Sequence, residues 1–254
     1  MLNPRVGYAV TVGVVASVAS LTLAHAQHVT NATASTSSSV AAATATADPV
    51  QRFLARTDEP LTRYRARRTL RARNERFNKE GWITVYTELD PTAGFTYRVI
   101  EEGGSSYIRN KVLRKALDGE GEAIAAGDTS RSALSATNYQ FSVTGADGPN
   151  TRVRITPLRK ERFLVDGTIT ITADSSDLVQ VEGRLARNPS FWTNRVDVVR
   201  RYGRIDGVRV PLSVESTANV KIAGTSAFSM TYEYESINGR PVATPSASAA
   251  APAR

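Results

Sequence analysis

The sequence predicts a mainly β (α+β) protein, in which about nine to eleven antiparallel strands form a strongly curved sheet with one or two helices packed on its concave side. Apolar and polar residues alternate with a period of two, which is typical of a sheet with one buried and one solvated face. Residues that favour turns separate the alternating segments. The turn signals are Asp90-Pro91, Asp147-Gly148-Pro149, Asp166-Gly167, Asp206-Gly207 and Asn238-Gly239.

The first 26 residues have the pattern of a signal peptide. Arg5 precedes an apolar stretch that closes on Ala24-His25-Ala26, so we expect cleavage between Ala26 and Gln27. A membrane-anchoring helix is the alternative, because the apolar stretch is nearly long enough to span a bilayer. Since the chain has no cysteine, it is not expected to be a lipoprotein. The sequence therefore predicts export to the periplasm or beyond.

Two segments flank the predicted domain, residues 48–239. Residues 27–47 are rich in Ala, Ser and Thr and have no apolar face, and residues 240–254 are similar in composition. Neither segment can bury enough apolar surface to offset the entropy lost on ordering. We expect a disordered linker and a disordered tail.

Two helices are expected within the domain. Asp48 is a suitable N-cap and Pro49 suits the first helical position, and this helix ends before Pro60. A second helix follows Ser105 or Ser106, where apolar residues recur at helical spacing, and Gly119 is expected to end it. The segment after it, residues 122–136, is either loop or weak helix.

Most of the remaining domain is predicted to form strands. The alternating segments are residues 81–89, 94–102, 151–156, 167–174, 207–216 and 228–236. In the first of these, Trp82 and Tyr86 share one face while Ile83 and Val85 share the other.

Residues 63–73, RYRARRTLRAR, are also predicted to form a strand. Five arginines fall on one face, and only Arg68 breaks the alternation. They are Arg63, Arg65, Arg67, Arg71 and Arg73. This face is either a solvated surface paired with acids such as Glu88, Glu101 and Glu102, or a surface that binds anionic membrane or an acidic protein. The formal net charge of +8 suits either interpretation, and export argues against nucleic acid as the partner.

Catalytic residue types are scarce. The chain has no cysteine, and its only histidine beyond residue 26 is His28, in the predicted linker. A Ser-His-Asp triad, a Cys-His pair and a histidine-rich metal site are therefore not expected. Asp174 and Asp177 fit a turn better than a pair of catalytic carboxylates. We expect no enzyme activity, no cofactor and no metal.

Residues 163–239 resemble the periplasmic lipoprotein-carrier superfamily, the LolA-, LolB- and RseB-like half-barrels often called outer-membrane lipoprotein-sorting proteins. The resemblance lies in DSSDLVQVEG (174–183), in PSFW (189–192) and in a hairpin of the form Y-x-x-x-D-G-V-x-V-P that ends at Pro211. More narrowly, the chain is similar to uncharacterised exported bacterial proteins with the NPSFW stretch. The resemblance implies a half-barrel around helices, with an apolar hollow that receives acyl chains.

Aromatic and apolar residues on adjacent predicted strands are candidates for the wall of that hollow, although plain core is the alternative. They are Trp82, Tyr86, Phe95, Tyr97, Phe228, Met230, Tyr232 and Tyr234. Phe191 and Trp192 follow a proline in a connection, where they are candidates to close one mouth of the half-barrel or to contact the ligand.

The leading hypothesis is therefore a soluble, monomeric periplasmic carrier that holds the acyl chain of a lipid or an acylated protein without covalent chemistry. The absence of a cysteine favours a soluble shuttle over a membrane-anchored receptor. The alternative is an envelope regulatory or protein-interaction module of the same fold, which would transport no ligand.

Overall fold

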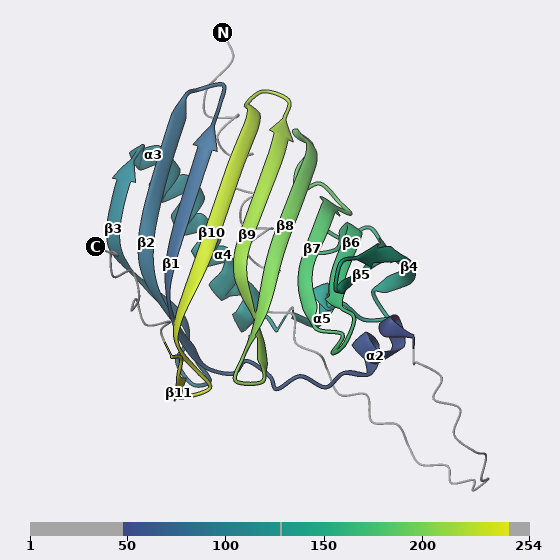
Figure 1. Cartoon of the computed structure of the whole chain (residues 1–254). Helices are drawn as coiled ribbons and strands as arrows, with labels where there is room; N and C mark the ends of the chain where they lie inside the picture. The colour runs from purple at the N-terminus through teal and green to yellow at the C-terminus, as the bar shows by residue number, and fades with distance from the viewer. Residues whose placement is uncertain (1–47, 128, 244–254) are drawn as a thin grey trace, which may run out of the picture.

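The computed structural model describes residues 48–127 and 129–243, and their strands form one antiparallel, curved and unclosed sheet (Figure 1). The spatial order is β3-β2-β1-β10-β9-β8-β7-β6-β5-β4, with β11 paired to β10. The strands are β1 (Tyr64–Asn74), β2 (Lys79–Asp90), β3 (Gly94–Gly104), β4 (Tyr139–Asp147), β5 (Asn150–Pro157), β6 (Val165–Thr172), β7 (Leu178–Leu185), β8 (Thr193–Ile205), β9 (Val208–Val220), β10 (Gly224–Ile237) and β11 (Arg240–Pro241). The predicted fold class is confirmed.

The helices lie on one face of this sheet. Helix α2 (Pro49–Ala55) begins as predicted, because an Asp48 carboxylate oxygen accepts a hydrogen bond from the Val50 N–H at 3.0 Å. Helix α3 (Ser106–Ile108), a π-helical turn η1 (Arg109–Leu113) and helix α4 (Arg114–Ala125) form one continuous segment, which we call the cover (residues 106–125). Figure 1 shows α3 and α4 behind the sheet. A short helix, α5 (Thr129–Ser132), follows.

Two local predictions were wrong. The helix does not end at Gly119, because Glu120 makes a buried ion pair with Arg68 and helix α4 runs on to Ala125. Asp166-Gly167 is not a turn but lies inside β6, where Asp166 pairs with Arg154 and Arg184 of the adjacent strands.

Gly167 is a glycine for a steric reason. Its backbone approaches β7 so closely that a Cβ atom there would lie 1.9 Å from the Glu182 carbonyl oxygen. The glycine that suggested a turn therefore serves a close contact between two strands.

The segments predicted to flank the domain lie mostly outside the described residues. The predicted signal peptide and linker, residues 1–47, are outside them, as is the tail from residue 244. Arg240–Pro241 form β11, so the sheet extends past Gly239, where the sequence placed the end of the domain.

Residues 56–63, which we call the strap, run from α2 along one end of the sheet to β1 (Figure 1). The Asn238 side chain accepts hydrogen bonds from the backbone of Thr62 and Arg63 and donates one to the Pro60 carbonyl. The strap is thereby tied to the end of β10.

Two apolar clusters form the core. The larger one lies between the concave face of the sheet, the cover and α2, and the smaller one packs Leu61 of the strap against residues of β1, β2, β9 and β10. β-Bulges interrupt the β1–β10, β2–β3 and β8–β9 ladders, and such bulges bend and twist a sheet. The curvature brings side chains from distant strands onto one concave surface.

Candidate functional site

Six of the predicted wall residues lie together on the concave face. Phe95 and Tyr97 come from β3, and the residues from β10 are Phe228, Met230, Tyr232 and Tyr234. The first three of those from β10 are buried, and the rings of Tyr232 and Tyr234 stack with centroids 5.9 Å apart. In this structure the six residues pack as core beneath the cover, as the alternative interpretation expected.

The cover is fixed to the sheet by a buried ion pair. The Arg68 guanidinium donates to both carboxylate oxygens of Glu120, at 2.8 and 3.1 Å, and the two side chains are 2% and 1% exposed. Arg68 also donates to the Tyr64 hydroxyl, and its guanidinium carbon lies 4.4 Å from the ring centroid of Tyr232. Arg68, the residue that broke the alternation of the arginine segment, therefore connects sheet and cover inside the core.

The outer side of the cover is held by exposed or half-exposed groups. Glu102 of β3 pairs with Arg109 at 2.7 Å and with Arg114 at 2.5 Å. The Tyr97 hydroxyl donates to Asp118 at 2.8 Å. Burial, followed by this hydrogen bond to a carboxylate, raises the pKa of Tyr97 to about 12. The π-helical turn η1 begins at Arg109, one of these contact residues, and such turns often mark functional sites.

Arg200 is a second charged residue inside the concave face. Its neighbours across the ladders are Val181 and Val214, and its side chain is only 3% exposed. Burial raises the pKa of Tyr139, while the hydrogen bond from the Val165 N–H and then the positive charge of Arg200 oppose the rise. Within the described residues, Nε and Nη2 of Arg200 have no hydrogen-bond partner. An unpaired buried charge is costly, so this position is suited to an anionic group.

Trp82 and Tyr86 lie on the opposite, convex face, so their predicted place in the wall is corrected. Trp82 stacks against Arg71, with the guanidinium carbon 5.8 Å from its ring, and the Tyr86 hydroxyl donates to Glu235. The reason is the pleat of β2, which turns Ile83 and Val85 into the core and its even-numbered neighbours outward. The alternation separated the two faces of β2 correctly. The large size of Trp82 and Tyr86 was wrongly taken as a sign that their face is the buried one.

The five arginines predicted to share a face are exposed on the convex side. Arg63 pairs with Asp90 at 3.0 Å, Arg65 with Glu88 at 3.1 Å and Arg73 with Glu75 at 3.4 Å. Glu88 is thus a partner as expected, whereas Glu102 pairs with the cover instead. Arg67 and Arg71 lie beside Tyr86 and Trp82. The surface is basic but partly neutralised.

Phe191 and Trp192, which we call the aromatic tip, do not join the concave site. Phe191 is 79% exposed and Trp192 is 37% exposed, and their rings meet edge to face at 5.6 Å. The connection between β7 and β8 turns them toward solvent, so they do not line the interior.

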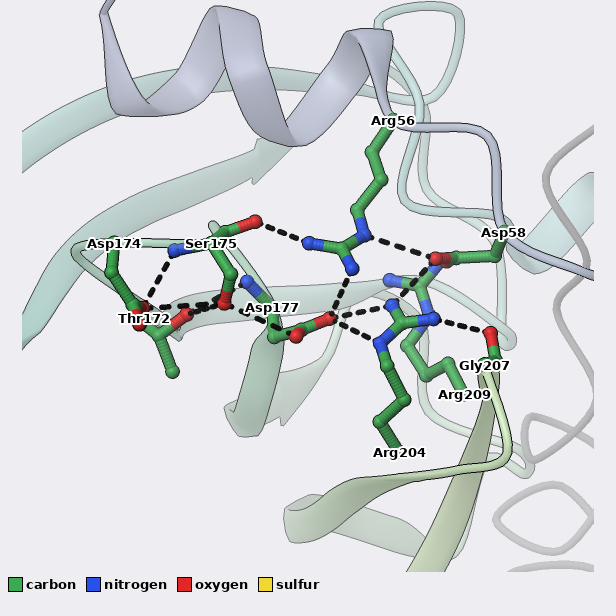
Figure 2. Close-up of polar contacts among 9 residues, drawn as sticks. All are labelled: Arg56, Asp58, Thr172, Asp174, Ser175, Asp177, Arg204, Gly207 and Arg209. Atoms are coloured by element: carbon green, nitrogen blue, oxygen red, sulfur yellow. Dashed lines mark hydrogen bonds and ion pairs between the residues drawn. The ribbon is translucent and has the colours of Figure 1, made fainter.

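A polar cluster that the sequence did not reveal ties the strap to two strand connections (Figure 2). Asp58 of the strap accepts from Arg204 at 2.6 Å, from Arg209 at 2.5 Å and from Arg56 at 3.2 Å. Asp177 pairs with Arg204 at 2.5 Å and with Arg56 at 3.2 Å. Burial favours a higher pKa for Asp177, but the hydrogen bond and charge of Arg204 outweigh it and hold the pKa below its usual value.

The sequence indicated the role of only some residues of this cluster. Asp174 and Asp177 were predicted to serve a turn, and the Asp174 carboxylate indeed accepts from the Ser175 N–H. The ion pair between Asp58 and Arg204 joins residues more than a hundred positions apart, and no spacing rule predicts such contacts.

The described residues hold no helix with both the length and the apolar character needed to cross a bilayer. The same residues also contain no group of three or more His, Cys, Asp or Glu side chains arranged to bind a metal ion.

No family model and no curated protein matches the sequence. Three solved structures are similar in fold. A domain named as an outer membrane lipoprotein-sorting protein, from Vibrio parahaemolyticus, shares 9% identity over 74% of this chain and 91% of its own, with a TM-score of 0.34. A DUF1329 family protein from Desulfovibrio piger shares 10% identity over 73% and 88%, with a TM-score of 0.31. A LolA superfamily protein from Nitrosomonas europaea shares 9% identity over 69% and 86%, with a TM-score of 0.31.

Proposed function

We propose that this protein is a carrier that binds an acyl-chain amphiphile between the concave face of its sheet and the cover, without covalent chemistry. The binding surface would be the aromatic and apolar side chains of β3 and β10, namely Phe95, Tyr97, Phe228, Met230, Tyr232 and Tyr234. Because they are packed under the cover in this structure, entry of a ligand requires the cover to move. Each methylene of the acyl chain that becomes buried there contributes about 0.8 kcal/mol, which offsets the cost of that movement.

The observation that carries the proposal is Arg200. A guanidinium that is 3% exposed and leaves two nitrogens without a partner among the described residues is costly within an apolar core. An amphiphile with an anionic group would supply the missing partner while its chain covers the apolar face. This favours a fatty acid or an anionic lipid as the ligand over a neutral one.

The first test is native mass spectrometry, with lipid extraction, of protein purified from its own host. The expected result is a bound molecule that contains an acyl chain. Export, expected from the first 26 residues, would place the encounter in the periplasm. An interior that takes up no amphiphile, either from the host or in titration, would overturn the proposal.

The second test compares a fatty acid with the fatty alcohol of the same chain length. Arg200→Met should weaken binding of the acid by about tenfold or more, since a hydrogen bond to a charged group contributes about 1.5–3 kcal/mol, and should change binding of the alcohol little. Arg201→Met is the matched control, because Arg201 is the next residue but is exposed and pairs with Glu215 on the convex side. Equal losses for acid and alcohol would contradict the assigned role of Arg200.

The exposed convex arginines favour a second candidate, an envelope interaction module that binds an acidic protein. Charge reversal of Arg65, Arg67 and Arg71 should abolish capture of such a partner and leave uptake of amphiphile unchanged. If that variant also lost uptake of the amphiphile, the idea that the acidic protein and the amphiphile bind to separate surfaces would be wrong.

A further inference from the structure

The aromatic tip is an exposed apolar feature on an ordered connection. Phe191 is 79% exposed, although a ring of this size is normally half-buried or better in a folded domain. The connection is nevertheless fixed: the Lys221 N–H donates to the Trp192 carbonyl at 2.9 Å, and the Asn188 side chain donates to the Asn194 carbonyl at 2.9 Å. The aromatic pair therefore projects from a held position.

Positive charge surrounds this pair. Lys221 lies with its ammonium nitrogen 4.1 Å from the ring centroid of Phe191. Within the described residues, Lys160, Arg162, Arg187 and Lys221 make no ion pair with an acidic side chain. Other arginines nearby are paired: Arg195 with Asp197, and Arg184 with Asp166, which Arg184 shares with Arg154.

Two open cavities share Asn188, and Phe191 of the tip lines one of them. One of about 470 Å³ is lined by Lys160, three arginines and Asp166. The other, of about 640 Å³, is lined by Arg131, Arg162, Arg187, Glu161 and Phe191 itself. The second cavity has room for an oxygen-rich anionic group beside Phe191. Asn194 and Arg195, which line the first cavity, lie at the start of β8, whereas Arg204 of the strap cluster lies near the end of that strand.

We propose that the aromatic tip and its four unpaired basic side chains bind the surface of a bilayer that contains anionic lipids. Aromatic rings settle at the level of the headgroups, and lysine and arginine beside them are attracted to anionic lipids. An acidic protein is the less suitable occupant, because a projecting ring needs a complementary pocket on a protein, whereas a fluid interface accepts it without one. The proposal is independent of whether the interior carries a ligand.

The test uses Trp192 as a built-in probe. The chain has two tryptophans, so Trp82→Phe leaves fluorescence from Trp192 alone. Vesicles of phosphatidylglycerol and phosphatidylcholine should bind this variant, shift the emission to shorter wavelength and allow quenching by brominated acyl chains. Pure phosphatidylcholine vesicles should bind at least tenfold more weakly, and added salt should weaken binding to the anionic vesicles.

Three variants decide the assignment in vesicle sedimentation, which needs no fluorescence. Phe191→Ser, and separately the joint change of Lys160, Arg162, Arg187 and Lys221 to Gln, should each reduce binding to anionic vesicles about tenfold or more. The charge-matched control changes Arg65, Arg67, Arg71 and Arg73 to Gln on the convex face and should retain binding.

Other outcomes overturn the proposal. A larger loss in the convex control than in the tip variants would assign membrane binding to the arginine face. Binding to polyglutamate, with no shift of Trp192 on vesicles, would point to an acidic protein as the occupant instead.

Discussion

Arg68→Met should lower the free energy of unfolding by about 3–5 kcal/mol, because it leaves Glu120 charged and unpaired in the core. The magnitude follows from the geometry: both side chains are at most 2% exposed, and the guanidinium contacts both carboxylate oxygens. Glu120→Leu should cost a similar amount by stranding Arg68 among the rings of Tyr64 and Tyr232. Against a total stability of about 5–15 kcal/mol, either loss is large.

The double variant, Arg68→Met with Glu120→Leu, should recover most of that loss. Replacing both partners of a buried pair with apolar groups is often neutral or stabilising. The double variant is therefore expected within about 2 kcal/mol of the original protein. Urea unfolding followed by tryptophan fluorescence and by circular dichroism measures all four forms of the cycle.

The matched control is the exposed pair Arg65 and Glu88, which also joins two elements, at 3.1 Å. The same substitutions there should show a coupling of no more than about 1 kcal/mol. If each single change at Arg68 and Glu120 cost under about 1 kcal/mol, or if the double variant lost the sum of the two, the idea that the pair locks the cover would be wrong.

Four further changes are informative. Asp58→Asn should cost about 2–3 kcal/mol in urea unfolding, since three arginines then lose their shared carboxylate. Because the folded pKa of Asp177 is depressed, its contribution is present above about pH 4 and lost as the pH falls through the folded pKa, so the difference from Asp177→Asn should vanish in acid. Gly167→Ala should cost about 1–3 kcal/mol or prevent folding, through overlap with the β7 backbone. The folded pKa of Tyr97 is raised to about 12. Its contribution to the free energy of unfolding is therefore present below about pH 10 and lost between about pH 10 and 12. Tyr97→Phe should remove that part of the stability loss at alkaline pH.

Local rules predicted what depends on neighbours along the chain. The period of two located seven strands, including the arginine segment that became β1, but it did not mark β4, β7 or β8. Asp206-Gly207 formed the β8–β9 turn, with positive φ at both residues. Asp48 capped its helix as expected. The same rules were wrong at Gly119, where the helix continues through Glu120, and at Gly167, where a close contact with β7 requires glycine.

The site was harder to predict, because its decisive contacts join distant segments. Arg68 was recognised as an exception, but nothing near it indicated Glu120, and Arg200 was not singled out although it follows Val196 and Val198 on the buried face of β8. The sequence did contain one signal for Arg200: it is a charged residue at a position where the alternation of its strand predicts a buried side chain. For Trp82 and Tyr86 the alternation was right, and size alone suggested the wrong face.

The first and last long strands are neighbours in the middle of the sheet, which has a consequence for how the chain acquires its structure. Arg68 of β1 contacts Met230 of β10, 162 residues further along the chain. A ribosome releases β1 long before β10, so the central ladder cannot form while synthesis is under way. Pairing of such distant segments is intrinsically slow, and the nascent protein should stay unfolded for longer than one with local contacts. That delay would keep the chain unfolded for translocation across a membrane if, as we propose, the first 26 residues direct export.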